Sequence, residues 1–126
     1  MVTVNGSFSG YSVDDTAAAL AFYRDRLGLE IDDNGMGLDL VLPGGQHVFL
    51  YPKHDHVPAT FTVLNLEVAD IDVAAAELRA AGIELERYDG MPQDDTGVLR
   101  GKAAGEGPDI AWFRDPAGNV LSILSA

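Results

Sequence analysis

Two stretches of the chain carry apolar side chains at helical spacing, residues 16–27 and 73–81, and predict helices. Each stretch follows aspartates whose carboxylates can accept the free amide hydrogens of a first helical turn. The candidate N-caps are Asp14 or Asp15 for the first helix and Asp70 or Asp72 for the second. Each stretch ends at a glycine, Gly28 or Gly82, which suits the left-handed residue that follows many helices.

Short alternating runs of apolar residues surround both helices and predict strands. One run ends at Val13, before the first helix, and a matching run ends at Val68, before the second. Directly after the helices, Leu29–Ile31 and Ile83–Leu85 alternate apolar and acidic side chains. We therefore expect a strand on each side of each helix.

The chain repeats this pattern, so it predicts two structural modules. The turn sequences Pro43–Gln46 and Pro116–Asn119 each join two apolar runs and predict hairpins. Each half then consists of a strand, a helix and three strands, a βαβββ module. Module one covers about residues 1–58 and module two about residues 59–126. Because one module alone leaves one face of its sheet uncovered, we expect both to form a single domain.

Composition narrows the classes of function. Apolar residues make up 47% of the 126 residues, which indicates a folded chain, and no apolar run is long enough to cross a membrane. The absence of cysteine excludes disulfides and thiolate metal ligands and leads us to expect a cytoplasmic protein. Binding to nucleic acid needs clustered Lys and Arg, whereas the net charge here is −12. We expect neither a nucleic-acid partner nor a membrane partner.

Three segments together resemble a known superfamily: residues 13–31 (VDDTAAALAFYRDRLGLEI), 68–85 (VADIDVAAAELRAAGIEL) and 114–124 (RDPAGNVLSIL). With the internal repeat, they make the chain similar to the vicinal oxygen chelate superfamily. That superfamily includes glyoxalase I, the extradiol dioxygenases and the bleomycin and fosfomycin resistance proteins. The resemblance implies an α+β fold in which two tandem βαβββ modules form a curved mixed sheet around a cavity, with helices outside. It also implies a homodimer, because members commonly dimerise.

The resemblance further implies where metal ligands would lie. In metal-using members, a His (sometimes a Gln) stands in the first strand of each module and a Glu in the last strand. The corresponding positions here are Phe8, Phe49, Val63 and Ser122. Phenyl and isopropyl groups offer no lone pair, and a neutral hydroxyl is a weak ligand beside imidazole or carboxylate. We therefore expect no metal and no other cofactor.

The histidines leave two interpretations open. His54 and His56 alternate in a loop and could bind a metal, but this spacing is poor geometry for a closed site and no third ligand is evident. A solvated segment at the rim of a binding site is the alternative. His47 stands alone on a predicted strand, where it is either structural, in contact with a ligand, or catalytic.

Strand alternation sorts the residues that would face the cavity. They mix aromatic rings with a few polar groups, a composition that suits a small organic ligand. The candidates are Asp39, His47, Phe49, Tyr51, Asn65, Glu67, Trp112, Arg114 and Ser122 on strands, and His56 and Tyr88 in loops. Aromatic rings can stack on a planar or cationic group, Asp39 and Glu67 can attract a positive charge, and Arg114 can bind a carboxylate. The alternative is an ordinary core between sheets, the interpretation favoured for Phe8 and Val63.

Two loops are long enough to close over a ligand. Residues 51–58 (YPKHDHVP) follow a predicted cavity strand, and residues 87–108 carry five glycines and mixed charge. The plausible contact residues of the second loop are Tyr88, Asp89, Arg100 and Lys102. A mobile surface loop is the alternative for this segment.

The sequence leaves open whether the protein is an enzyme. Our first hypothesis is a metal-free small-molecule-binding protein that sequesters its ligand, as the bleomycin resistance proteins do. The second is a glyoxalase-like or dioxygenase-like enzyme, of the lyase or isomerase type, that uses acid–base residues without the usual metal. Its catalytic candidates are His47 and Glu67. A third possibility is a partner module that pairs through its sheet edges.

Overall fold

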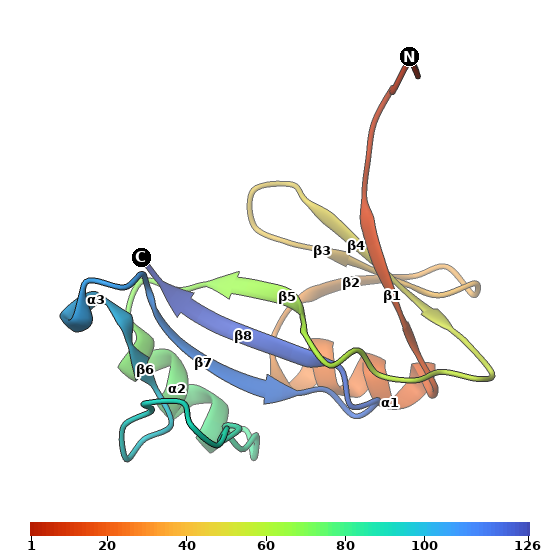
Figure 1. Cartoon of the computed structure of the whole chain (residues 1–126). Helices are drawn as coiled ribbons and strands as arrows, with labels where there is room; N and C mark the ends of the chain where they lie inside the picture. The colour runs from red at the N-terminus through yellow and green to blue at the C-terminus, as the bar shows by residue number, and fades with distance from the viewer. The chain divides into compact units, whose positions relative to one another are not determined.

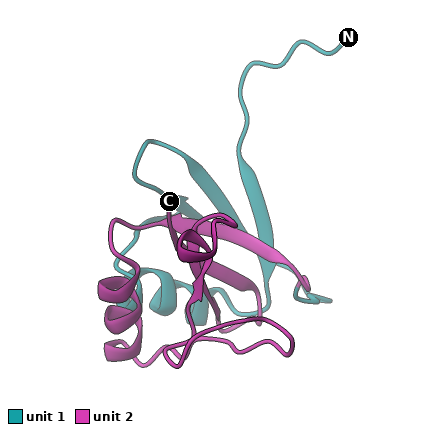
Figure 2. Cartoon of the chain, turned by 60° about the vertical axis from the view of Figure 1, so that its left-hand side comes forward, with its two compact units in different colours: residues 1–58 teal, residues 59–126 magenta.

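The computed structural model describes residues 1–126, and the chain forms two compact units, residues 1–58 and 59–126 (Figure 2). Each unit holds one four-stranded mixed sheet with a helix packed on one face (Figure 1). The predicted α+β fold of two βαβββ modules is confirmed. Neither sheet is closed into a barrel, because each has two edge strands.

Unit 1 contains four strands in the order β1-β4-β3-β2. Strand β1 runs parallel to β4, and the other neighbours are antiparallel. The elements are β1 (Ser9–Val13), α1 (Thr16–Leu20), η1 (Ala21–Arg26), β2 (Glu30–Asp33), β3 (Leu38–Val41) and β4 (His47–Pro52). The predicted first helix is therefore helical over almost its whole length, but its second half, η1, winds as a π-helix.

The helix-facing side of the unit 1 sheet forms its core. Leu40 and Leu50 are fully buried on that side, and Val13 of β1 joins them. Tyr23 of η1 is fully buried as well, and its hydroxyl lies 2.8 Å from the hydroxyl of Tyr11 in β1. A buried phenol needs such a partner, so this hydrogen bond fixes the helix on the sheet.

Unit 2 contains strands in the order β5-β8-β7-β6, again with one parallel pair, β5 and β8. Its elements are β5 (Thr62–Glu67), α2 (Ile71–Ala80), β6 (Leu99–Arg100), α3 (Gly101–Ala104), β7 (Asp109–Arg114) and β8 (Val120–Ser125). The helix-facing side of this sheet buries Phe113 and Leu121, and helix α2 contributes Ala75 and Leu78 to the core. Alternation along each strand places the remaining side chains on the side away from α2, which we call the open face, although Val120 and Ser122 of β8 are buried there as well.

Both helices begin where the sequence pattern predicts, and hydrogen bonds show which aspartate of each candidate pair is the N-cap. Asp15 Oδ1 accepts the Ala18 backbone amide at 3.0 Å, and Asp70 Oδ1 accepts the Asp72 amide at 2.9 Å. Asp15 and Asp70 are therefore the N-caps. Gly28 and Gly82 take φ angles of 73° and 79° after the two helices, in the left-handed region.

The prediction of a strand at Ile83–Leu85 is wrong, because this segment lies outside every strand. The backbone after α2 meets the sheet at one point, where the Glu86 amide donates to the Trp112 carbonyl at 2.7 Å. The fourth strand of unit 2 is instead β6, which pairs with β7 after a long connection. Alternation alone does not distinguish a strand from an extended segment that only passes along a sheet.

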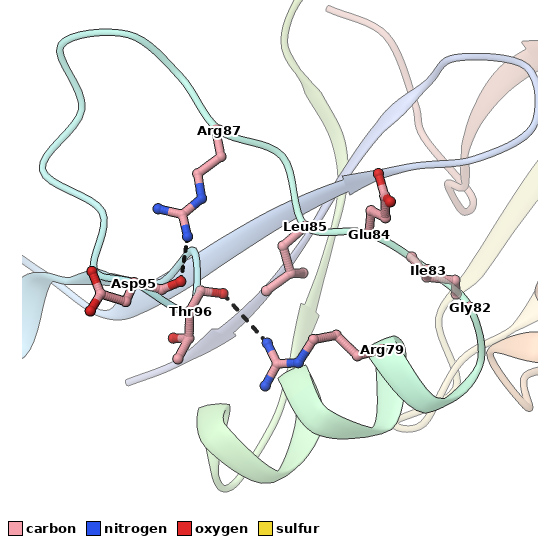
Figure 3. A pocket seen from close by; sticks show the side chains of 8 residues that line it. All are labelled: Arg79, Gly82, Ile83, Glu84, Leu85, Arg87, Asp95 and Thr96. Carbon is pink, nitrogen blue, oxygen red and sulfur yellow. Dashed lines mark hydrogen bonds between the residues drawn. The ribbon is translucent and has the colours of Figure 1, made fainter.

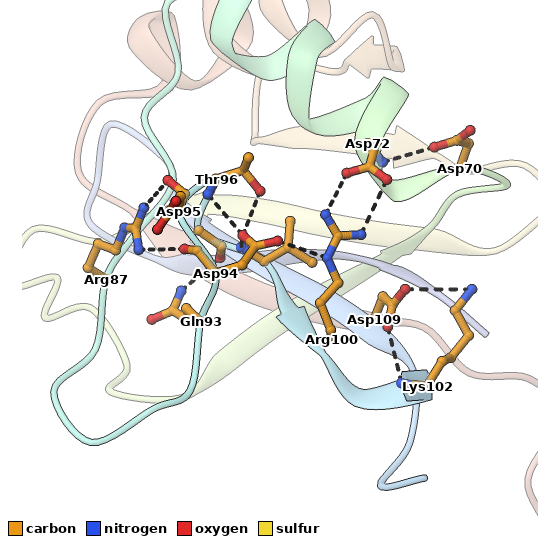
Figure 4. A network of polar contacts seen from close by, with 12 residues as sticks. Asp70, Asp72, Arg87, Gln93, Asp94, Asp95, Thr96, Arg100, Lys102 and Asp109 are labelled. Atoms are coloured by element: carbon orange, nitrogen blue, oxygen red, sulfur yellow. Dashed lines mark hydrogen bonds and ion pairs between the residues drawn. The ribbon is translucent and has the colours of Figure 1, made fainter. Parts of the chain in front are cut away.

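The 87–108 loop is ordered by a polar network around Arg100 (Figure 4). Its guanidinium donates to Asp72 of α2 at 2.6 and 3.2 Å and to Asp94 at 2.9 Å. Asp94 also accepts from the Thr96 amide and hydroxyl and from the Val98 amide. Burial alone would raise the Asp94 pKa, but the hydrogen bonds from Thr96 and Arg100 hold that pKa far below its ordinary value.

A second contact at the end of the loop fixes helix α3 to strand β7. Asp109 accepts the Lys102 backbone amide at 3.1 Å, and the Lys102 ammonium lies 3.8 Å from the same carboxylate. Gly101 passes so close to the next turn that an added Cβ would lie 2.3 Å from the Pro108 carbonyl oxygen. Arg100 and Lys102 thus make contacts within the chain, and whether they also contact a ligand stays a prediction. None of the helices is long and apolar enough to span a membrane.

Candidate functional site

The open face of the unit 2 sheet gathers six of the residues predicted to bind a ligand. Strand register places Asn65 of β5 beside Ser122 of β8, and Ser122 beside Trp112 of β7. The three side chains lie in one row, on the face opposite α2, because their neighbours Leu64, Leu121 and Phe113 are buried on the helix side. The remaining members of this face are Glu67, Arg114 and Tyr88.

Ser122 is the innermost member of the row, with 0% of its surface exposed. Its hydroxyl donates to Asn65 Oδ1 over 2.6 Å. A buried hydroxyl must be paired to avoid a desolvation penalty, and Asn65 provides that partner from the exposed end of the row. Ser122 therefore acts on this face through Asn65.

Trp112 supplies the largest apolar surface of the face. Its Nε1 donates to Thr62 Oγ1 at 3.2 Å, and the side chain is half-buried. The Tyr88 ring meets the indole edge-on, with centroids 5.6 Å apart and ring planes at 77°. This geometry is a favoured arrangement for two aromatic rings, so the pair forms a preorganised wall.

Tyr88 is positioned by Gln93, which lies in the same loop. Gln93 Oε1 accepts the Tyr88 amide at 2.9 Å, while its Nε2 donates to the carbonyls of Glu86 and Gly97 at 2.9 and 2.8 Å. Burial and the nearby Glu86 carboxylate raise the pKa of the Tyr88 hydroxyl above its ordinary value. The phenol thus remains protonated at neutral pH and offers a neutral donor.

Arg114, the one cation of this face, is already paired. Arg114 Nε forms an ion pair with Glu86, and its Nη1 donates to the Gly118 carbonyl at 3.0 Å. A ligand carboxylate would have to compete with both partners. Glu67, at the end of β5, is exposed and faces outward beside Leu124 of β8.

The turn before β8 explains how Ser122 reaches its place. The buried Asp115 carboxylate accepts the amides of Ala117 and Asn119 at 2.9 and 2.8 Å, and the Asn119 side chain at 3.0 Å. Gly118 takes a φ angle of 83°, as the turn sequence predicts. These bonds fix the first residue of β8 and hence which residues of that strand face the open side.

The open face of the unit 1 sheet is aromatic at its centre. The rings of Phe49 and Tyr51 stack with centroids 6.2 Å apart. Glycines make room for Phe49: a Cβ at Gly37 would lie 2.6 Å from its ring, and one at Gly10 would lie 2.9 Å from its carbonyl oxygen. The absence of these two side chains leaves room for the Phe49 ring, which is partly buried, to lie over the sheet.

Polar groups flank this aromatic pair. His47 Nδ1 lies 2.7 Å from Asp39 Oδ2, and Asp32 of β2 is the register partner of Asp39. His56, in the loop after β4, places its Nδ1 2.6 Å from the Ser12 hydroxyl. The sequence prediction that these residues share one face thus agrees with the register; whether they contact a ligand stays a prediction.

A separate groove of about 670 Å³ lies in unit 2, between the end of α2 and the loop at residues 95–96 (Figure 3). It shares no residue with the predicted set. Its lining residues are Arg79, Gly82, Ile83, Glu84, Leu85, Arg87, Asp95 and Thr96. Both guanidiniums are used by the loop: Arg79 donates to the Thr96 carbonyl at 3.4 Å and Arg87 to the Asp94 carbonyl at 2.7 Å. Both cationic side chains of the groove thus hold the loop in place.

Sequence reasoning missed residues that shape the open face without standing out in any pattern. Thr62, Glu86 and Gln93 hold Trp112, Arg114 and Tyr88 respectively. Thr62 and Glu86 act across 50 and 28 residues of the chain, and Gln93 acts within an irregular loop, so no local pattern reports these contacts. The one available signal was the turn sequence Asp94–Gly97, which marks a tight turn next to Gln93.

Comparison with known proteins then settles the family. The family model described as Glyoxalase/Bleomycin resistance protein/Dioxygenase superfamily matches residues 7–123, nearly the whole chain. The chain belongs to this superfamily. No curated protein matches it.

Solved structures of the Glyoxalase superfamily share the fold of this chain. The fosfomycin resistance protein FosX from Listeria monocytogenes is 12% identical, with a TM-score of 0.70 over 99% of this chain and 95% of that one. A lactoylglutathione lyase from Agrobacterium tumefaciens is 23% identical, with a TM-score of 0.64 and coverage of 98% and 95%. An antibiotic-binding protein from a Streptomyces species is 20% identical, with a TM-score of 0.65 and coverage of 98% of both chains.

The residues at the expected metal positions of this superfamily member do not fit a divalent cation. Phe8 precedes β1 and is 72% exposed, and Val63 lies at a register shift in β5. The inward position in a regular strand that alternation predicts is thus not found for either residue. Phe49 offers only a ring, and Ser122 offers a hydroxyl already bonded to Asn65. No three His, Asp or Glu side chains, His54 and His56 included, are arranged to hold a metal. A metal needs several such ligands in one place.

Proposed function

We propose that this protein binds a small organic molecule on the open faces of its sheets without a metal ion, and sequesters it rather than transforming it. The observation that carries this proposal is the bond between Ser122 and Asn65. Where metal-using members would present a glutamate, this chain presents a buried hydroxyl whose proton is committed to a neighbouring amide. The position therefore holds a buried, neutral polar group rather than a charged ligand for a metal.

The composition of the open faces supports an organic ligand. Each face carries an aromatic pair, Trp112 with Tyr88 in unit 2 and Phe49 with Tyr51 in unit 1. Aromatic surface contributes affinity through burial, while a few polar groups set orientation. On each face the polar groups lie beside the aromatic pair, Asn65 on one and the His47–Asp39 pair on the other.

Two of the structural relatives are named for antibiotics, which are small organic molecules. One is named as a fosfomycin resistance protein and another as an antibiotic-binding protein. At such low identity these likenesses establish a shared fold, and fold alone leaves the chemistry open. Together with the missing ligand set, they favour a binding role of the resistance type.

A second candidate function is metal-independent acid–base catalysis, and one contact favours it. The Asp39 carboxylate bonds to Nδ1 of His47, which leaves Nε2 of this half-exposed imidazole free to exchange a proton with a ligand. The other catalytic candidate is Glu67, whose carboxylate is exposed to solvent. Under this alternative, His47→Ala abolishes turnover but leaves ligand affinity within a few fold.

The remaining features of the proposal concern assembly and location. We expect a homodimer, because each sheet keeps free strand edges at β1 and β5 that a second copy can cover. We expect a cytoplasmic location, since a chain without cysteine gains nothing from an oxidising compartment.

Native mass spectrometry of the purified protein, before and after treatment with a chelator, tests the proposed function. We expect organic adducts, either copurified or taken up from a mixture of planar compounds, that survive the chelator. Trp112→Ala removes the wall of the face and should abolish these adducts, whereas Val73→Ala, an exposed change on α2, should leave them intact. Adducts that require an added metal ion would contradict the proposal.

A further inference from the structure

Among the strand residues Asn65, Ser122, Trp112 and Arg114 on the open face of unit 2, one side-chain donor is uncommitted, and it lies on the edge strand β5. The Trp112 indole N–H is used by Thr62, and the Arg114 guanidinium by Glu86 and Gly118. The Asn65 amide uses its oxygen to accept from Ser122, and its Nδ2 makes no hydrogen bond within the chain. A side-chain amide nitrogen carries two N–H donors.

Ser122 decides which way the Asn65 amide is turned. Its hydroxyl is fully buried and needs an acceptor, and Asn65 Oδ1 provides one at 2.6 Å. Because the amide oxygen is held toward the buried Ser122 in the middle of the row, the amide nitrogen is directed away from it, toward the exposed side. Asn65 is itself exposed, so its N–H groups are accessible to a ligand.

We propose that Asn65 donates a hydrogen bond from Nδ2 to a carbonyl oxygen of a planar ligand held against Trp112, with Ser122 as the positioning residue. This inference rests on the proposed function and narrows its ligand to planar molecules that carry a neutral acceptor. The register fixes the arrangement, since Asn65, Ser122 and Trp112 stand side by side on three adjacent strands.

The charge of the protein favours a carbonyl over a carboxylate as the hydrogen-bond acceptor on the ligand. The net charge is −12, and Glu67 lies on the same face as Asn65, two residues along β5. An anionic ligand would approach against this field, and the one cation of the face, Arg114, is already paired with Glu86. A neutral carbonyl accepts the same hydrogen bond without that penalty.

Matched pairs of probes test the assignment: coumarin with 2H-chromene, 1-indanone with indane, and acetophenone with ethylbenzene. In each pair the ring system is similar and the carbonyl is the main difference. Titrations followed by the NMR signals of the Asn65 side-chain amide and the Trp112 indole N–H report on the site directly. We expect each carbonyl compound to bind about fivefold more tightly than its counterpart, the effect of one net hydrogen bond.

Substitutions distinguish the role of Asn65 as the hydrogen-bond donor from the role of Ser122 in positioning it. Asn65→Asp keeps an acceptor for Ser122 but has no N–H to donate, so the preference for carbonyl compounds should vanish. Ser122→Ala should reduce the preference, because the amide is then free to turn, and Ser122→Thr, which keeps the hydroxyl, should restore it. A purely structural role of Ser122 would weaken both members of every pair equally and leave the preference unchanged.

The outcomes separate this inference from the proposed function. Equal affinity within all pairs, with Trp112 shifting in both, would overturn the assignment of Asn65 while leaving ligand binding in place. A preference for 1-indanol-type donors over carbonyl compounds would overturn it too, since it would mean that Asn65 presents its oxygen. If no probe shifts either signal up to about 5 mM, the weak range expected for fragments, the proposed function itself is contradicted.

Discussion

The indole Nε1 of Trp112 donates to the Thr62 hydroxyl at 3.2 Å, and this bond links β7 to β5 past the intervening strand β8. It fixes the only tryptophan of the chain at the centre of the open face of unit 2. Intrinsic tryptophan fluorescence therefore reports on this face alone.

A ligand bound as proposed should change the emission of Trp112 in a saturable manner. Trp112→Phe should retain an aromatic wall and lower the affinity only a few fold, while Trp112→Ala should lower it about tenfold or more, because most of the buried apolar area is lost. Isothermal titration checks the affinities of both variants, which carry no fluorescent reporter. Equal affinity of the wild type and Trp112→Ala would place the ligand elsewhere.

Introducing at position 122 the glutamate that metal-using members of the superfamily carry should not create a metal site. Ser122→Glu puts a charge where no surface is exposed and should lower the free energy of unfolding by about 3 kcal/mol or more. Ser122→Ala, the matched control, should cost only about 1 kcal/mol for one lost hydrogen bond.

Thermal unfolding with and without manganese, nickel or zinc checks this expectation for Ser122→Glu. We expect no stabilisation by the metal, since Phe8, Phe49 and Val63 still offer no ligand atom. A metal-dependent rise in the melting temperature of this variant would show that the remaining ligands are present after all.

The network around Arg100 predicts how stability depends on pH. The pKa of Asp94 is lower in the folded state than its ordinary value of 3.8, so its contribution to stability is complete above that pH and is lost as the pH falls through the lower value. Asp94→Asn should lower the free energy of unfolding at pH 7 by about 1–2 kcal/mol, a range reduced because solvent reaches part of the carboxylate.

Urea unfolding between pH 7 and pH 2 measures this effect. The wild type should lose stability below pH 4 more steeply than Asp94→Asn, so the two curves should converge in acid. Glu106→Gln, which changes an exposed carboxylate outside the Arg100 network, provides the control and should follow the wild type. Parallel curves for Asp94→Asn and the wild type would contradict the assigned role of the network.

Gly37 should tolerate no side chain, because its Cβ would lie 2.6 Å from both the Phe49 ring and the Leu50 carbonyl oxygen. We expect Gly37→Ala to displace the ring and to destabilise the protein by about 1–3 kcal/mol. Gly6→Ala, with no atom within 4 Å of its Cβ, should change the stability by less than about 0.5 kcal/mol. Circular dichroism melts of the two variants make the comparison; similar melting temperatures would contradict the close approach.

Features that depend on local chemistry could be predicted from the sequence. Asp15 and Asp70 cap their helices, and Gly28 and Gly82 end them, because caps and left-handed glycines require only nearby backbone groups. The repeat likewise predicted two βαβββ modules. Strand alternation predicted the shared face of Asn65, Ser122 and Trp112 because the period of a strand is fixed by its geometry.

Features that depend on distant contacts could not be predicted. The shift of register at Val63 moves this residue out of the regular alternation of β5, and no residue type announces such a bulge. The pairing of Arg100 with Asp72 could not be predicted either, because Asp72 is far away in the sequence. The segment Ile83–Leu85 alternates like a strand but lacks a neighbour to pair with.

Metal-independent binding by the row of Asn65, Ser122 and Trp112 is the central claim, and one measurement tests it most directly. Native mass spectrometry of the wild type, incubated with coumarin and an equimolar mixture of manganese, nickel and zinc, records the ligand and the metal on the same molecule. The account predicts a coumarin adduct that a chelator does not remove, and no stoichiometric metal. One tightly bound metal ion per chain, or an adduct that forms only with the metal, would contradict it.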